Sequence, residues 1–170
     1  GGSKQLARAG DQAARATAKQ GRAVDAAEGT VAHNPNDAAA RVALGEAYLQ
    51  AGRFQSAAVT LQDAITLGDE SGRTQLHLAL AQIGSGDSRS AVELLDGARD
   101  AIPASDRGLA LALAGETGRG VAVLLDALRG GENSPKLRQN LAFAYALDGQ
   151  WREARIAMAQ DVPTDRIDDR

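Results

Sequence analysis

Large and small apolar residues follow one another in a fixed phase along most of the chain. Leu44 is followed directly by Gly45, and Leu61 lies between Ala57 and Ala64 at helical spacing. Apolar residues three and four positions apart predict amphipathic helices. Two helices that cross closely need glycine or alanine at the crossing and a larger side chain in the hole beside it. The segment from Leu44 to Ala64 therefore predicts two antiparallel helices pressed together.

The same pattern recurs three more times. A glycine returns at spacings of 34, 29 and 34 residues, at Gly52, Gly86, Gly115 and Gly149. The fifth residue after each glycine is small: Ala57, Ala91, Gly120 and Ala154. The residue four further on is large: Leu61, Leu95, Leu124 and Met158. The eighth residue before each glycine forms a column of Leu44, Leu78, Arg107 and Leu141, and a small residue follows each of them. Since a tight turn between helices favours a residue that tolerates positive φ, the glycines predict the turns.

Eight helices follow from this register. We expect them at 38–51 and 54–67, at 72–84 and 88–100, at 105–114 and 118–129, and at 135–148 and 151–160. The 29-residue interval indicates that the third pair has lost about one turn from its first helix, with Ser105 or Asp106 as the new N-cap. Upstream, a degenerate fifth pair is expected at 4–18 and 21–33.

These columns resemble the tetratricopeptide repeat, a helix-turn-helix unit of 34 residues with the motif L-G-x-x-Y, a later alanine and a closing proline. The resemblance implies an all-α superhelix, an α-solenoid, of about five helix pairs. We expect one solenoid over 4–162, with units near 4–37, 38–71, 72–100, 101–134 and 135–162. Residues 1–3 are expected to be an expression scar, and residues 163–170 a polar tail with a truncated cap.

Composition agrees with helices and narrows the function. Aromatic residues make up only 3% of the chain, and alanine and leucine supply much of its 44% apolar share. With 19 basic and 22 acidic side chains the net charge is -3, which gives no strong electrostatic footprint for nucleic acid. The absence of cysteine excludes disulfides, thiolate metal sites and a cysteine nucleophile.

Residues for catalysis, cofactors or metals are sparse. His33 and His77 are the only imidazoles, and neither has a second histidine at helical spacing. The stretch IGSGDS at 83–88 lacks the lysine that would grip a phosphate, so we interpret it as a turn between helices. We expect no catalytic, cofactor-binding or metal site.

A protein-binding groove is the expected functional feature. Stacked helix pairs present the first helix of each unit on a concave side that suits an extended or helical peptide. Helical phase places ten residues on that side: Val42, Glu46, Leu49, Leu76, Leu80, Ile83, Leu109, Leu113, Phe143 and Leu147. Tight curvature would bury about half of them against neighbouring units; otherwise they form a groove for an apolar segment.

The last unit resembles a narrower family. It reads KLRQNLAFAYALDGQWREARIAMAQDV from Lys136 to Val162 and is similar to the final repeat of the TadD family, tetratricopeptide proteins of the tight-adherence (Flp) pilus assembly system. The residues that match that pattern are Arg138, Asn140, Leu141, Ala142, Ala144, Tyr145, Leu147, Gly149, Ala154, Arg155, Gln160 and Asp161.

The TadD resemblance implies a non-enzymatic, pilotin-like lipoprotein that helps an outer-membrane secretin to assemble or localise. It implies a periplasmic location, a secretin or another pilus component as partner, and membrane attachment only through a lipid anchor preceding Ser3. Two alternatives stay open: a generic repeat adaptor of another envelope or cytosolic complex, and the regulatory repeat portion of a larger enzyme.

Overall fold

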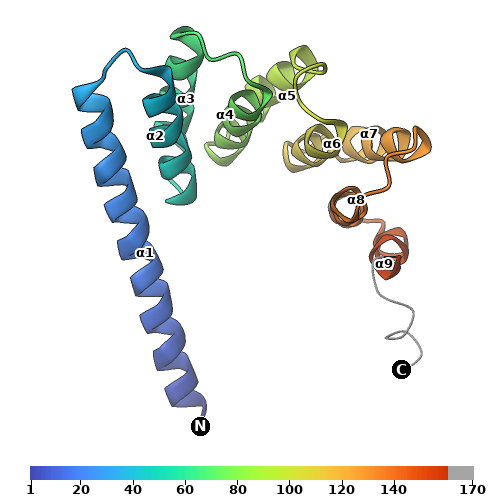
Figure 1. The fold of residues 1–170 in the computed structure, drawn as a ribbon. Helices are drawn as coiled ribbons and strands as arrows, with labels where there is room; N and C mark the ends of the chain where they lie inside the picture. The colour runs from blue at the N-terminus through green and yellow to red at the C-terminus, as the bar shows by residue number, and fades with distance from the viewer. Residues whose placement is uncertain (161–170) are drawn as a thin grey trace. The chain divides into compact units, whose positions relative to one another are not determined.

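The computed structural model describes residues 1–160, and these form helices joined by short connections (Figure 1). The chain divides into two compact units, Gly1–Glu70 and Ser71–Arg170. The division falls within a residue of the expected boundary between the repeat units 38–71 and 72–100. The single solenoid over 4–162 stays a prediction, and the expected tail at 163–170 lies outside the described residues.

The first unit contains three helices: α1 (Gly2–His33), α2 (Ala38–Gln50) and α3 (Phe54–Thr66). Helices α2 and α3 form the expected pair, and α1 packs against α2. The N-cap Asp37 accepts hydrogen bonds from the N–H groups of Ala39, at 3.0 Å, and Ala40, at 3.4 Å, and so satisfies donors that the first turn of α2 leaves free. Arg41 of α2 forms a salt bridge with Asp63 of α3 at 3.3 Å.

The second unit contains three helix pairs within the described residues. They are α4 (Gly72–Gly84) with α5 (Ser88–Gly97), α6 (Ala104–Leu113) with α7 (Thr117–Arg129), and α8 (Pro135–Leu147) with α9 (Trp151–Ala159). The first helices of successive pairs are neighbours, since α4 contacts α6 and α6 contacts α8. The second unit thus has the stacked arrangement that the repeat predicts.

The predicted turns are confirmed. Gly52, Gly86, Gly115 and Gly149 have φ values of 74°, 90°, 95° and 78°. In these turns an L-residue would be strained, and glycine is not. The shortened third pair is also confirmed, because α6 has 10 residues and α2, α4 and α8 have 13 each.

The upstream pair expected at 4–18 and 21–33 is wrong, because α1 is one continuous helix of 32 residues. The position 34 residues before the turn glycine Gly52 holds Ala18. Alanine is a strong helix former and disfavours the positive φ of the turn, so the helix continues where the other units reverse direction. Gly21 does not interrupt it and is not among the glycines with positive φ.

Two further boundaries need correction. Helix α6 begins at Ala104 with Pro103 as its N-cap, and not after Ser105 or Asp106. Helix α5, expected over 88–100, ends at Gly97. The chain turns there because Ile102, only 2% exposed, must enter the core, and because the carbonyl of Ala101 approaches the start of α4.

Candidate functional site

The small-residue columns form the contacts between paired helices. Ala57, Leu61 and Ala64 are fully buried in the first unit, as are Ala91 and Leu95 in the second. Leucines of the column eight residues before each turn glycine are buried as well: Leu44, Leu78 and Leu141. Met158, the last member of the large column, is 52% exposed and lies on the last helix that the structure describes. This framework fixes which face of each first helix is left for another function.

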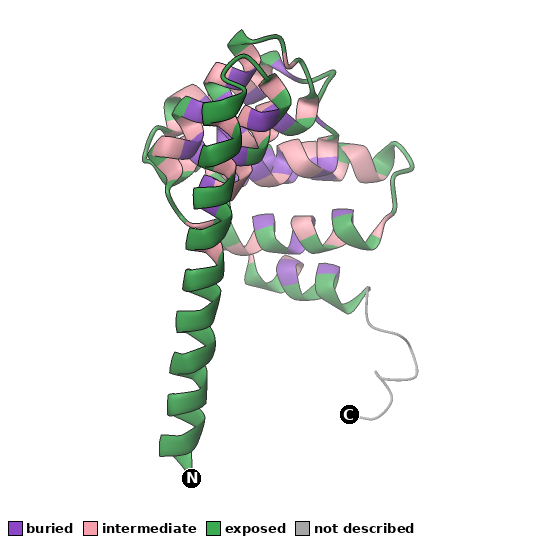
Figure 2. Cartoon of the chain, turned by 60° about the vertical axis from the view of Figure 1, so that its left-hand side comes forward, coloured by how far each residue is buried: buried purple, intermediate pink, exposed green. Residues whose placement is uncertain are grey.

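The ten residues predicted for the groove all retain some exposure. Seven are half-buried: Val42, Glu46, Leu49, Leu76, Leu80, Ile83 and Leu109. Leu113, Phe143 and Leu147 are 39%, 51% and 43% exposed. None of the ten lies in the fully buried part of the core, and Figure 2 shows the half-buried and exposed positions along the helices.

In the second unit, the predicted groove residues lie on α4, α6 and α8, and those on each helix share a face. Leu76, Leu80 and Ile83 lie at i, i+4 and i+7 on α4 and pack against the core formed with α5 and α6. Leu109 and Leu113 on α6, and Phe143 and Leu147 on α8, are each four residues apart and share a helix face. Because α6 contacts both α4 and α8, we call these seven residues the first-helix stripe.

In the first unit, Val42, Glu46 and Leu49 share one face of α2 at the same helical spacing. All three are half-buried. They belong to the predicted groove, and the first-helix stripe is defined by the second unit alone.

The residues of the narrower sequence match are largely structural. Leu141, Ala142 and Ala144 are buried. Asn140 of α8 donates a hydrogen bond from Nδ2 to the carbonyl oxygen of Ser105 at 2.9 Å and so ties α8 to the first turn of α6. Arg138 donates hydrogen bonds to the backbone carbonyl and side-chain oxygens of Asn133. Asp161, at the end of the match, lies outside the described residues.

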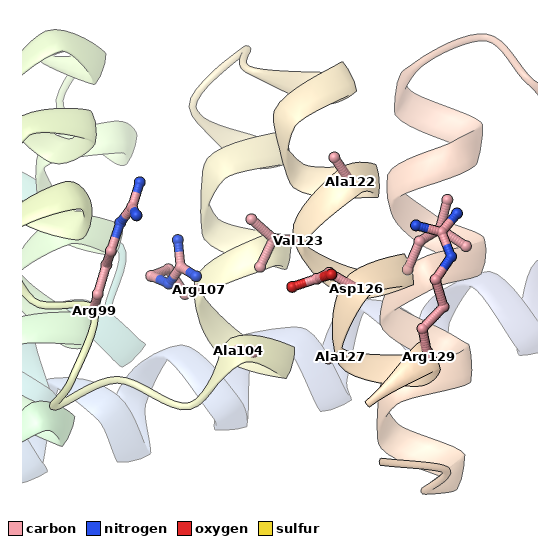
Figure 3. A pocket seen from close by; sticks show the side chains of 9 residues that line it. Arg99, Ala104, Arg107, Ala122, Val123, Asp126, Ala127 and Arg129 are labelled. Atoms are coloured by element: carbon pink, nitrogen blue, oxygen red, sulfur yellow. The ribbon is translucent and has the colours of Figure 1, made fainter. Parts of the chain in front are cut away.

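Sequence reasoning missed a pocket of about 540 Å³ in the second unit. It is lined by residues of the connection between α5 and α6, of α6 and of α7: Arg99, Ala104, Arg107, Ala122, Val123, Leu125, Asp126, Ala127 and Arg129 (Figure 3). The sequence held one sign of this pocket: Arg107 is the only charged residue in a column whose other members are leucines.

Within residues 1–160, no group of three or more histidine, cysteine or acidic residues is placed to hold a metal ion. None of the helices described there has both the length and the apolar character needed to cross a bilayer.

The fold defines the class of protein. Residues 12–71 match the family described as tetratricopeptide repeat. Together with the helix pairs and turn glycines, this match identifies an all-α fold of the tetratricopeptide-repeat type. None of the curated proteins compared with the chain matches it.

Solved structures share this fold. "MamA 41-end from Desulfovibrio magneticus RS-1" is 18% identical, with a TM-score of 0.64, over 94% of this chain and 93% of that one. "MamA AMB-1" is 22% identical, with a TM-score of 0.59, over 84% and 88%. YrrB, described as a TPR protein with an unusual peptide-binding site, is 16% identical, with a TM-score of 0.57, over 82% and 74%. At these identities the similarity establishes the fold alone.

Proposed function

We propose that the chain is a non-catalytic scaffold that binds a protein segment along its first helices. The observation that carries the proposal is the exposure of large apolar side chains on the first-helix stripe, above all Phe143 at 51%. Adjacent exposed apolar side chains, rather than single ones, are typical of interaction surfaces. Phe143 and Leu147 lie one turn apart on α8 and are both exposed. The described peptide-binding site of YrrB, which has the same fold, supports the same use of this chain.

The strength of such binding can be bounded. If three or four side chains of the stripe become buried, each contributes roughly 1.5 to 3 kcal/mol before the costs of association are subtracted. A dissociation constant of about micromolar order is then expected. The partner segment should be apolar where it meets α4 and α8.

We further propose that the partner belongs to the tight-adherence pilus system, with a secretin as the first candidate. The support is the similarity of residues 136–162 to the final TadD repeat. In this proposal the protein is a pilotin-like lipoprotein, facing the periplasm and anchored to the outer membrane, that aids secretin assembly or localisation. An adaptor role in another complex is the alternative, because the tetratricopeptide-repeat fold alone specifies no partner.

The test is a pull-down from envelope extract with the wild type and with a variant carrying Leu80→Ser and Phe143→Asp. Secretin or another pilus component should be recovered with the wild type and lost with the variant, while the helical circular dichroism persists. Ile156→Asp is the matched control, because Ile156 is 52% exposed but lies on α9, a second helix. Recovery of a different complex would favour the adaptor role, and equal recovery by all variants would remove the groove.

A further inference from the structure

The pocket in the second unit carries an excess of positive charge. Arg99, Arg107 and Arg129 line it, and Asp126 is the one carboxylate among its lining residues (Figure 3). Within the described residues, none of these three arginines takes part in a salt bridge. Figure 3 shows Arg99 and Arg107 near each other and Arg129 apart from them, so the lining has three positive charges and one negative charge and is attractive to an anion.

Arg107 contributes to this excess of positive charge from a partly buried position. Its Nε atom is buried and has no hydrogen-bond partner. Burial lowers the pKa of Arg107, and the positive charge of Arg99 lowers it further, whereas Asp96 opposes the shift. Asp96 is already engaged by Arg119 in a salt bridge of 2.6 Å. A partly buried guanidinium short of acceptors is costly, so an acceptor that reaches the accessible N–H groups of Arg107 is favoured.

The remaining walls of the pocket decide which anion fits. Ala104, Val123 and Leu125 give it apolar surface, which suits the aliphatic part of a side chain or a chain end. A free inorganic anion has no apolar part that could use this surface. The apolar walls beside the arginines therefore favour a carboxylate carried on an apolar stem.

We propose that this pocket binds a carboxylate of an acidic polypeptide segment, from either an Asp or Glu side chain or the chain terminus. Arginine is suited to this task because its planar donors match the two oxygens of a carboxylate. The pocket is formed by α6, α7 and the connection between α5 and α6, and it shares no residue with the first-helix stripe. It is therefore a second binding site, independent of the proposed groove.

The test is fluorescence anisotropy of the full chain with two short labelled peptide libraries. One library carries Asp or Glu at alternate positions, and the other carries Asn or Gln there; each is made with a free and with an amidated C-terminus. The acidic library should bind and the neutral amidated library should not. Binding of the neutral library only when its C-terminus is free would identify the chain terminus as the source of the carboxylate.

Three variants locate the site. Arg107→Leu restores the leucine of the repeat column, so it should fold at least as well as the wild type and weaken acidic-peptide binding by about tenfold or more. Arg99→Ala, at an exposed position, should weaken binding without affecting the fold. Arg89→Leu is the control, because Arg89 is on α5 and its side chain is 92% exposed in a surface pair with Glu93.

Unchanged binding by Arg107→Leu and Arg99→Ala would overturn the proposal, and so would equal binding of both amidated libraries. Displacement of the peptide by inorganic phosphate at the peptide's own affinity would also overturn it, since it would indicate a general anion site. Phe143→Asp should leave this binding unchanged. The experiments therefore distinguish a failure of the groove proposal from a failure of the pocket proposal.

Discussion

Gly45 of α2 faces Leu61 of α3 so closely that a Cβ atom on the glycine would lie 2.5 Å from both Cγ and Cδ2 of the leucine. The same relationship recurs in the second unit, where a Cβ on Gly108 would lie 2.6 Å from Cγ of Leu124. Both leucines are fully buried and have little room to move. The small and large columns of the sequence are therefore the two sides of one helix crossing.

Gly45→Ala should destabilise the first unit by about 1 to 3 kcal/mol, because the new methyl group overpacks the buried side chain of Leu61. Chemical denaturation monitored by circular dichroism measures the change. Gly29→Ala in α1 is the control, since nothing lies within 4 Å of a Cβ there. That substitution should be neutral or stabilise by up to about 1 kcal/mol. Equal effects of the two would refute the close crossing.

Gly72→Ala should destabilise more than Gly45→Ala. A Cβ at Gly72 would lie 1.9 Å from the backbone oxygen of Ala101, and backbone yields less readily than a side chain. The expected loss is about 3 kcal/mol or more, at the upper end of overpacking effects. Gly97→Ala, where nothing lies within 4 Å, is the matched control for thermal unfolding. A Gly72→Ala protein with wild-type stability would contradict this contact.

Asp148 should make stability depend on pH at the end of α8. Its carboxylate accepts hydrogen bonds from Thr117 Oγ1 at 2.7 Å and from Gln150 Nε2 at 2.5 Å. The hydrogen bond from Thr117, and then that from Gln150, lowers the pKa of Asp148 below its ordinary value of 3.8. Because the folded-state pKa is depressed, the stabilisation is present above the ordinary value and is lost as pH falls through the folded-state value.

The measurement is urea denaturation of the wild type and of Asp148→Asn from neutral pH down to the acid limit of the fold. The wild type should be the more stable of the two at neutral pH, and the difference should shrink below about pH 4. A difference that stays constant over this range would show that the charge of Asp148 contributes nothing.

The N-terminal part of α1 should be far less protected than its C-terminal part. Residues 1–19 are exposed on every face, whereas Val24 is only 2% exposed and packs in the first unit (Figure 2). A helix without tertiary packing is marginal in water, so its amides should exchange rapidly. Hydrogen exchange by NMR should find strong protection at 24–33 and little before residue 19. Uniform protection along α1 would contradict it.

The sequence was sufficient for most of the fold because the repeat imposes the same packing constraint four times. Turn glycines and small residues set the phase, so most helix boundaries agree with the structure to within one residue. Prediction failed where this constraint lapses. At Ala18 a helix former occupies the turn column, and the length and helix propensity of the segment suggested a helix pair where the chain forms one helix. Helix α5 ends at Gly97 because of the packing of Ile102 and the close approach at Gly72. Neither contact leaves a signal in the sequence around Gly97.

The candidate sites were harder to predict from the sequence than the fold was. Helical phase placed the first-helix stripe on one side of each helix, but how much of each side chain is exposed depends on the neighbouring pair. The arginine pocket combines residues from three elements. Only Arg107, standing in a column of leucines, indicated that something other than a uniform core was present.

Photo-crosslinking in cells tests the central claim most directly. A photoreactive amino acid is placed at Phe143 on α8, or at Ile156 on α9 as the control with equal exposure. The account predicts a discrete crosslinked protein from position 143, identified by mass spectrometry as a secretin or another pilus component, and none from position 156. The same crosslinks from both positions, or none from position 143, would contradict the claim that the first helices bind a partner.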